Sequence, residues 1–229
     1  MLALPDIDKL VIDSPELGCV LYLPGLPGGS NKIHDRSPYC NTGTITGATW
    51  KRLPSGLWVL WFDGTDDVVN CGSHASLDIS SAYTIKAWIY SEDVTVNASI
   101  VCKNDAEAVQ PFLLYHRNTA QLRYFASADG VAWGTQITTN NTISDDTWYH
   151  IVVTHDGSTT KMFVNVAEWG SDTSPDDPQT GTGDSVFWGK RGTQLLQGYI
   201  ALPEIHNRAW SLLEVHKSFN REKHLFGVW

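Results

Sequence analysis

The sequence lacks both an excess of basic residues and a long apolar segment. Lysine and arginine total 16 against 25 aspartates and glutamates, which gives a formal net charge of -9. A field of that sign repels nucleic-acid phosphates and anionic lipids, so neither nucleic acid nor a membrane is an expected partner. No apolar run approaches the roughly 20 residues that span a bilayer. Residues 1–18 carry charges and prolines where a signal peptide needs an apolar stretch.

Cysteine is scarce, and its spacing does not favour a metal site. The four cysteines show no CxxC pair, which a zinc site or a redox pair would need. Without an export signal, free and mostly buried thiols are the favoured state. Disulfides remain an alternative, because spacing does not choose among the pairings. The residues are Cys19, Cys40, Cys71 and Cys102.

The sequence also lacks the motifs of common hydrolases. G-x-S-x-G, H-E-x-x-H and a phosphate-cradling glycine loop are absent. The acidic runs at 6–9 and 172–177 lie in a terminal segment and in a proline-containing loop, so neither places paired carboxylates on a strand face. His150 and His155 stand five apart in one expected strand and would point to opposite faces. We therefore expect no catalytic residues and no metal ligands.

What the sequence does contain is a succession of short segments rich in β-branched and aromatic residues. Gly, Asp, Asn and Pro separate them at intervals typical of β-sandwiches. The expected strands are 19–25, 58–64, 83–91, 111–117, 121–127, 148–157, 160–169, 185–190 and 198–207. In 83–91, Ile85, Ala87 and Ile89 share one face, and the alternate residues, bulky as well, share the other. This pattern predicts an all-β domain with two packed layers.

The end of the chain changes character and predicts one short helix. Ser211 and Glu214 have the spacing of a capping box, and Leu212, Val215 and Phe219 recur at nearly helical intervals. The predicted organisation is an N-terminal tail at 1–16, one domain at 17–220 and a C-terminal tail at 221–229. The acidic segment 170–184 is expected to be a loop with too little apolar content to pack.

An acidic stretch at 62–69, "FDGTDDVV", has the composition of a small metal site. Asp63 precedes a glycine as the aspartates of other predicted tight turns do, and Asp66 and Asp67 follow shortly after. We expect these aspartates to accept backbone hydrogen bonds at a strand–turn–strand corner rather than to bind a metal.

Six stretches, taken in order, resemble a laminin-G-like domain of the concanavalin A-like jelly-roll superfamily across residues 18–220. They are "VLYLPGLPGGSNKIHDRSPYCNTGTITGATW", "FDGTDDVV", "LDISSAYTIKAWIY", "WYHIVVTHDGSTTKMFVN", "FWGKR" and "GYIALPEIHNRAWS". The resemblance implies a curved sandwich of two antiparallel sheets that binds carbohydrate or protein, sometimes with a structural calcium.

The chain departs from this family at positions that matter for cofactors and catalysis. Ala201 stands where the family's last strand often carries the calcium-binding carboxylate, so no cofactor is expected there. The E-x-D-x-x-E pattern of the superfamily's β-glucanases is absent as well. A glycoside hydrolase is therefore the least favoured reading.

Aromatic residues are the remaining indication of function, since sugar rings stack their C–H faces on indole and phenol rings. Trp61, Trp88, Trp148 and Trp188 fall where the family places packing residues, so we expect them in the core. Trp133 and Trp169 flank loops and are expected to reach solvent. The predicted carbohydrate-binding residues are Trp133, Trp169, Tyr115, Tyr124 and Asp105.

The sequence thus predicts a non-catalytic module that recognises a glycan. The alternative is a structural or adhesive surface protein, such as a phage or virion decoration, which docks or self-associates through its terminal tails. Phe226 and Trp229 would then contact a partner, unless they fold back onto the domain's own sheet. Location stays open between the cytoplasm and a virion.

Overall fold

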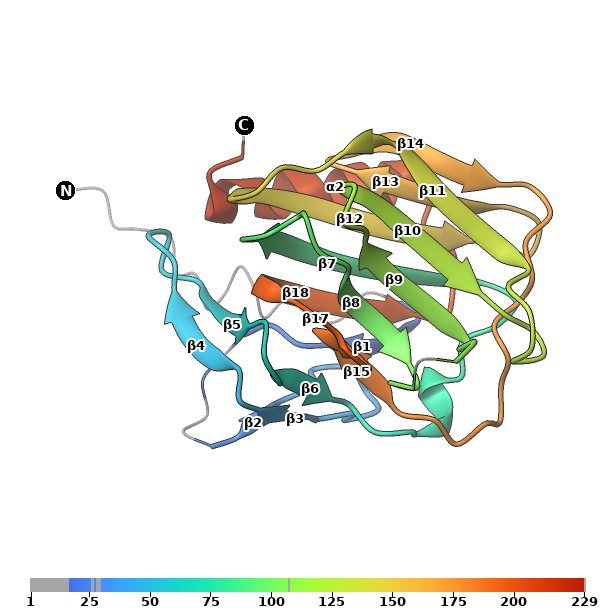
Figure 1. The fold of residues 1–229 in the computed structure, drawn as a ribbon, viewed down its shortest axis with the longest axis horizontal. Coiled ribbons are helices and arrows are strands. Elements are labelled where there is room, and N and C mark those ends of the chain that lie inside the picture. Colours follow the sequence, from blue (N-terminus) through green and yellow to red (C-terminus); the bar gives the residue numbers. More distant parts are fainter. Residues whose placement is uncertain (1–16, 26, 28–29, 107, 229) are drawn as a thin grey trace.

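The computed structural model describes residues 17–25, 27, 30–106 and 108–228. Two eight-stranded antiparallel sheets and one α-helix, α2, dominate this part of the chain (Figure 1). The expected all-β sandwich with a short C-terminal helix is confirmed. Within the described ranges, no helix combines the length and the apolar composition that crossing a bilayer requires.

The first sheet, here called sheet A, carries the helix. Its strands, in spatial order, are β14 (Ala167–Asp172), β13 (Thr160–Val164), β12 (Thr147–His155), β7 (Tyr83–Ser91), β18 (Gln197–His206), β5 (Trp58–Asp63) and β4 (Thr49–Arg52), with β1 (Cys19–Tyr22) also paired to β18. The central strands β12, β7 and β18 are the longest, and they position most of the residues discussed below.

The second sheet, sheet B, faces sheet A across the core. Its order is β11 (Thr135–Thr142), β10 (Gln121–Ala126), β9 (Phe112–His116), β8 (Ala98–Lys103), β15 (Val186–Trp188), β6 (Val68–Asn70), β3 (Gly43–Thr46) and β2 (Lys32–Ile33). A small hairpin of β16 (Lys190–Arg191) and β17 (Gln194–Leu195) and a short 3-10 turn, η1 (Ala75–Leu77), complete the connections.

Alternation along the strands builds the core between the sheets. On β7, Ile85, Ala87 and Ile89 point inward and join the main hydrophobic cluster, as the sequence predicts. Lys86 and Trp88 point to the outer face, yet both are fully buried. The outer face of sheet A is therefore covered where these two residues lie.

Helix α2 (Leu212–Glu222) provides that cover. It begins at Ser211 with the predicted capping box, in which the Ser211 backbone N–H donates to Glu214 Oε2 at 2.7 Å. A 3-10 turn, η2 (Lys223–Phe226), follows directly. The Trp88 ring stacks on Phe219 from α2 and on Phe226 from η2, with centroids 5.7 and 4.2 Å away. Apolar stacking thus fixes the end of the chain to the sheet.

These contacts correct the predicted boundary at residue 220. The helix continues through Glu222, and Leu225 and Phe226 are buried against sheet A, so residues 221–226 belong to the domain. The reading in which Phe226 folds back onto its own sheet is correct, while Trp229 and the 1–16 tail lie outside the described residues.

The acidic segment after Trp169 is also more ordered than its composition suggests. β14 extends through Asp172, and the rest is held by hydrogen bonds. Gln179 N–H donates to the Ser127 carbonyl at 2.7 Å, and the Thr135 hydroxyl donates to the Asp176 carbonyl at 2.9 Å. The predicted loop is confirmed for 173–184, but polar and backbone groups, which hydropathy does not count, attach it to sheet B.

All four cysteines are free thiols, which agrees with the favoured prediction. Cys19, Cys71 and Cys102 are buried and Cys40 is exposed. Burial raises the pKa of the Cys102 thiol to about 12, with nearby Asp105 adding to the shift.

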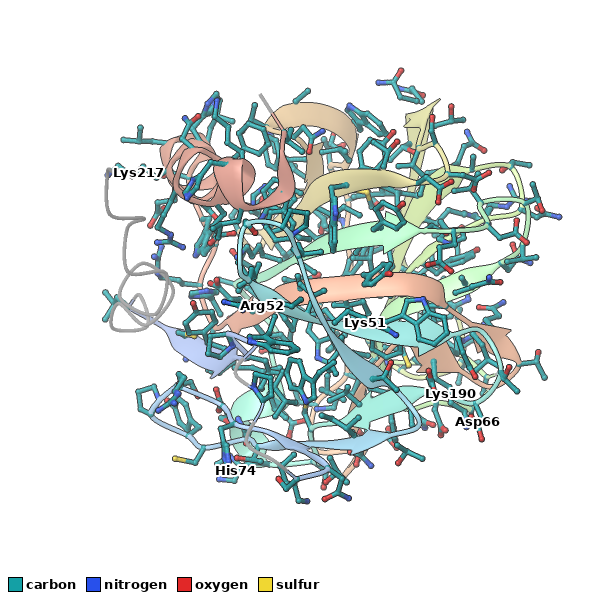
Figure 2. The ribbon with its side chains drawn as sticks, turned by 90° about the vertical axis from the view of Figure 1, so that its left-hand side faces the viewer. Lys51, Arg52, Asp66, His74, Lys190 and Lys217 are labelled. Atoms are coloured by element: carbon teal, nitrogen blue, oxygen red, sulfur yellow. The ribbon has the colours of Figure 1, made fainter. Side chains whose placement is uncertain are left out.

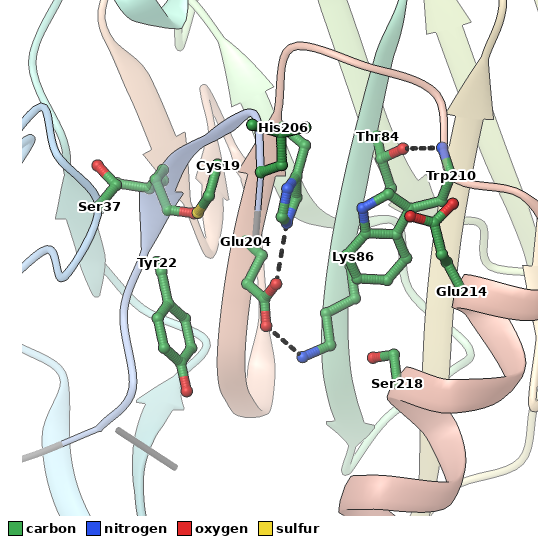
Figure 3. A network of polar contacts seen from close by, with 12 residues as sticks. Cys19, Tyr22, Ser37, Thr84, Lys86, Glu204, His206, Trp210, Glu214 and Ser218 are labelled. Carbon is green, nitrogen blue, oxygen red and sulfur yellow. Dashed lines mark hydrogen bonds and ion pairs between the residues drawn. The ribbon is translucent and has the colours of Figure 1, made fainter. Parts of the chain in front are cut away.

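A buried charge network joins the helix to sheet A, and Figure 3 shows its Lys86–Glu204 and Glu204–His206 contacts. The Lys86 ammonium lies 2.8 Å from Glu204 Oε1 on β18 and 2.7 Å from Glu222 Oε2 at the end of α2. Trp88 Nε1 donates to Glu222 Oε2 at 2.7 Å, and the His206 ring contacts Glu204 Oε2 at 3.0 Å. Burial raises the pKa of Glu204, but Lys86 and His206 lower it more, so that it ends below its usual value.

Removing the central cation should therefore destabilise the fold strongly. We expect Lys86→Met to lower the free energy of unfolding by about 3–5 kcal/mol, because two buried carboxylates lose their counter-ion. Urea denaturation measures the change. The control is Lys161→Met, which breaks the exposed Lys161–Glu168 pair at 3.0 Å and should cost no more than about 1 kcal/mol. Equal effects of the two variants would contradict the role assigned to the network.

Acid should weaken the same region through His150, which is buried beside Ser218 of α2. Burial lowers the pKa of His150 well below its usual value; Lys86 and Arg221 lower it further, and Glu204 opposes them. The folded pKa lies below the unfolded value of about 6.5, so the contribution of neutral His150 is present above that pH and is lost as the pH falls.

We therefore expect the free energy of unfolding to fall below about pH 6, by up to 1.4 kcal/mol per pH unit from this residue. Urea titrations between pH 8 and pH 4.5 measure the slope. His150→Gln should reduce the slope, whereas His216→Gln, on the exposed side of α2, should leave it unchanged. An unaltered slope in His150→Gln would show that another group governs the acid sensitivity.

Candidate functional site

Two of the predicted binding residues meet on the outer face of sheet B. Tyr115 and Phe125 belong to one small cluster, and Trp133 stacks on Phe125 with ring centroids 5.1 Å apart. Arg123 lies over Phe125, 4.3 Å from its centroid, and donates to the Tyr115 hydroxyl at 3.1 Å. Because these neighbours cover it, Tyr115 keeps only 8% of its surface exposed. Of this cluster, Trp133 is the more accessible predicted residue.

The other three predicted residues lie apart from this cluster or face the interior. Asp105 lies in the loop after β8, where its carbonyl accepts a hydrogen bond from Gly192 N–H at 2.6 Å. Trp169 on β14 packs against the main core, edge-on to Tyr149. Tyr124 is fully buried and donates its hydroxyl to Tyr83 at 2.8 Å. The structure therefore does not gather the predicted residues into one site.

Strand register explains why Tyr124 is not at the surface. In the β9–β10 pair, Tyr115 lies opposite Arg123, while Tyr124 lies opposite Leu114, which points into the core. Directly opposed residues share a face, so Tyr115 and Tyr124 face opposite sides. Tyr115 and Tyr124 therefore do not share a surface, and the strand pairing that separates them was not read from the sequence.

A more exposed set of aromatic side chains lies on the outer face of sheet A, beside η2. Trp61 lies opposite Tyr199, Tyr199 lies opposite Tyr90, and Tyr90 lies opposite Trp148. The four residues therefore form one line across β5, β18, β7 and β12, here called the aromatic row. Each of the four is partly exposed. Their neighbours in sequence, such as Leu60 and Ile200, point inward to the core.

Three rings of the aromatic row, those of Tyr90, Trp148 and Tyr199, contact one another but are not coplanar. Tyr90 lies 5.4 Å from Trp148 at an interplanar angle of 53°, and 5.3 Å from Tyr199 at 88°. Trp148 and Tyr199 lie 5.9 Å apart at 49°. Tilted and edge-to-face contacts of this kind fix these three rings in place. The row thus presents a rigid, stepped apolar surface.

Polar groups border the aromatic row. Trp61 Nε1 donates to Glu92 Oε1 at 3.0 Å, and Gln197 donates to the other Glu92 oxygen at 3.4 Å. Burial and a hydrogen bond with Asp146 raise the pKa of the Tyr90 hydroxyl. Burial and the nearby negative charge of Glu92 raise the pKa of the Tyr199 hydroxyl. Both hydroxyls therefore keep their protons at neutral pH. Carboxylate acceptors, an amide and phenol donors all lie within reach of a molecule on the row.

The two ends of the row differ. At the Trp61 end, Lys51 of β4 lies over the indole, with its ammonium 5.2 Å from the ring centroid (Figure 2). At the other end, Trp148 forms one wall of a groove of about 360 Å³, whose remaining walls are the 53–55 loop and residues 224–227. Phe226 of η2 contacts Trp148 at 4.7 Å and closes that side. The row is thus continuous with a groove beside the C-terminal segment.

The sequence reading missed this row because it placed Trp61 and Trp148 in the core. Trp88 and Trp188 are fully buried, as expected, but Trp61 and Trp148 are not. Alternation does contain the missing information, since Leu60 and Phe62 fill the inward positions of β5 and leave Trp61 outward. What the sequence does not give is how far the helix extends over the outer face.

Asp63, Asp66 and Asp67 form the one group of three potential metal ligands detected among the described residues, with ligand atoms within 4.8 Å of one another. Their carboxylates already serve the chain. Asp67 Oδ2 accepts from Asp63 N–H, and Asp63 Oδ1 accepts from Thr65 N–H, both at 2.8 Å. For Asp63 and Asp67, the predicted role as acceptors of backbone hydrogen bonds at a corner is confirmed, and the absence of a bound metal stays a prediction. Calcium needs six to eight oxygen ligands, so these residues would require several more.

Ala201, where the family often carries a carboxylate, is buried against Trp88 and the C-terminal segment. A ligand that binds only the folded state raises the melting temperature. Because we expect no calcium to bind, the melting temperature should be the same, within about one degree, in calcium and in excess chelator. Differential scanning calorimetry tests this. A fall of several degrees in chelator would show that the chain holds calcium despite Ala201, and Asp66→Asn would then report whether the acidic corner is the site.

Comparison with known proteins agrees with this architecture. The model of the family described as the concanavalin A-like lectin/glucanases superfamily matches residues 63–216. No match is found among curated proteins. Similarity to solved structures is at the level of the fold, since sequence identities are low.

Three solved structures illustrate the similarity. The binding domain of Paraclostridial Mosquitocidal Protein 1 aligns with 92% of this chain and 55% of its own length, at 16% identity and a TM-score of 0.75. The botulinum neurotoxin serotype D binding domain aligns with 89% of this chain and 51% of its own, at 14% identity and a TM-score of 0.67. This chain therefore spans about half of each toxin domain.

The third is domain 4 of AbnA, an extracellular arabinanase from Geobacillus stearothermophilus, whose structure contains arabinotriose. It aligns with 87% of this chain and 97% of its own length, at 16% identity and a TM-score of 0.68. The alignment thus includes nearly the whole of a domain solved together with a sugar.

Proposed function

Because this chain belongs to the concanavalin A-like lectin/glucanases superfamily, we propose that it is a non-catalytic carbohydrate-binding module that contacts its ligand through the aromatic row. The observation that carries the proposal is the alignment of Trp61, Tyr199, Tyr90 and Trp148 on one partly exposed face. The apolar faces of sugar rings stack on such aromatic rings, and their hydroxyls need acceptors and donors at the edge.

The polar border of the row supplies those partners. Glu92 can accept hydrogen bonds from sugar hydroxyls, and its position is fixed by Trp61 and Gln197. The Tyr199 hydroxyl is protonated and can donate, and the Tyr90 hydroxyl, which donates to Asp146, can accept. The Tyr90, Tyr199 and Trp148 rings are held by contact with one another, so little side-chain entropy would be lost on binding.

The structural neighbours support a binding role. The AbnA domain was solved with arabinotriose, and the toxin structures are of binding domains. Catalysis has less support. The two closely placed buried carboxylates, Glu204 and Glu222, share the Lys86 ammonium beneath α2, and each side chain is only 6% exposed. A substrate does not reach them there, so they do not form a glycosidase pair.

The alternative of an adhesive or structural surface protein rests on the similarity to toxin binding domains. In that reading a protein receptor would occupy the outer face of sheet A. Leu225 and Phe226 are already buried within the chain, so they are not available for docking or self-association, while Trp229 and residues 1–16 lie outside the described residues.

Substitutions in the row test the proposal. We expect Trp61→Ala and Tyr199→Ala each to weaken binding of a glycan by about 1–3 kcal/mol, as loss of an aromatic contact would. A glycan array identifies the ligand and isothermal titration calorimetry gives the affinities.

Trp133→Ala, on the outer face of sheet B, is the matched control and should bind as the parent does. Thermal melting of each variant shows whether it is folded. If Trp133→Ala lost binding while the row variants kept it, the site would lie on sheet B. An array without any bound glycan would contradict carbohydrate recognition altogether.

A further inference from the structure

The arrangement of the aromatic row also indicates what shape of carbohydrate it accommodates. Resting on the proposed function, we infer that the row binds one neutral polysaccharide chain that runs across the strands, is twisted along its length, and contacts the protein over at least three sugar units. Monosaccharides and flat crystalline polysaccharide surfaces are poor ligands on this view. Length, tilt and charge of the row each support one part of the inference.

The length of the row sets the number of sugar units. Trp61 and Trp148 lie on β5 and β12, with β18 and β7 between them. Neighbouring strands are about 4.8 Å apart, so the backbones at the two ends are separated by about 14 Å, while the Trp148 ring leans to within 5.9 Å of the Tyr199 ring. One sugar ring covers about one aromatic side chain and cannot touch both ends. A ligand that uses the whole row is therefore a chain of three or more units, directed across the strands.

The tilt of the rings sets the shape of that chain. Tyr90, Trp148 and Tyr199 make mutual angles of 49°, 53° and 88°. A crystalline polysaccharide surface presents coplanar sugar rings, which would stack on one of these aromatic rings and miss the others. A single chain whose successive units are rotated presents a differently oriented face at each step. The stepped row therefore favours a soluble, twisted chain.

The charges around the row set the chemical class. Glu92 accepts from Trp61, and Asp146 interacts with the Tyr90 hydroxyl, so two carboxylates border the row. Lys51 is the opposing cation, and its ammonium is directed over the Trp61 ring. With a net charge of -9 on the chain as well, uronic and sialic acids are repelled. Neutral sugars, whose hydroxyls donate to carboxylates, match this border.

Oligosaccharides of defined length test the inference directly. Arabino-, xylo- and cello-oligosaccharides of one to six units are titrated into the full chain by calorimetry. In the series that binds, affinity should rise at least about tenfold from one unit to three or four, because each added unit reaches a further aromatic ring, and then level off. Polygalacturonate should bind more weakly than the neutral chains.

Two variants separate the ends of the row from its centre. Trp61→Ala and Trp148→Ala should remove most of the gain between the shorter and the longer oligosaccharides and leave the shortest ligand that binds nearly unchanged. Tyr199→Ala, at the centre, should weaken binding at every length. Trp133→Ala again serves as the folded control on the opposite sheet.

Equal affinity for one unit and for six, retention on microcrystalline cellulose without binding to any soluble oligosaccharide, or a preference for polygalacturonate would each overturn this inference. In all three cases the chain would still bind carbohydrate, so the proposed function would stand. Failure to bind any sugar, soluble or insoluble, would contradict both.

Discussion

The burial of one ammonium group between two carboxylates is the interaction on which the layout of this molecule depends. Lys86 belongs to the centre of sheet A, Glu204 to the neighbouring strand β18 and Glu222 to the last turn of α2. A charge buried on the outer face of a sheet is unfavourable without partners, so its presence requires the helix to remain there. The Trp88 ring, held between Phe219 and Phe226, adds apolar contact to the same attachment.

This attachment divides the outer face of sheet A into two parts. Under α2 and η2 the outward residues are Lys86, Trp88 and Ala201, all buried. Beyond η2 the same strands continue with Tyr90 and Tyr199, which are partly exposed. The aromatic row therefore exists as a surface because the helix ends where it does. Stability and the proposed recognition use the same strands but mostly different residues, and Trp148 connects the two parts because it contacts Phe226, which stacks on Trp88.

The local elements of this structure could be read from the sequence, whereas the surfaces could not. The alternation of Ile85, Ala87 and Ile89 and the capping box at Ser211 depend on neighbouring residues, and both were predicted correctly. The side of the sheet on which Tyr124 lies and the exposure of Trp61 depend on which strands pair and on which elements cover the sheet. Those relations join residues far apart in the chain, and composition and spacing do not encode them.

The same reasoning separates the two aromatic clusters as candidate sites. On sheet B, Arg123 and Trp133 lie over Phe125, and Tyr115 is bonded to Arg123, so the ring faces there are already used within the chain. On sheet A the rings of Tyr90, Tyr199 and Trp148 meet at tilted or edge-to-face angles, which leaves part of each exposed while fixing its orientation. A ligand gains most from apolar surface that is rigid but not yet covered. That condition holds for the row, and it explains why the strands of sheet A rather than the loops supply the proposed site.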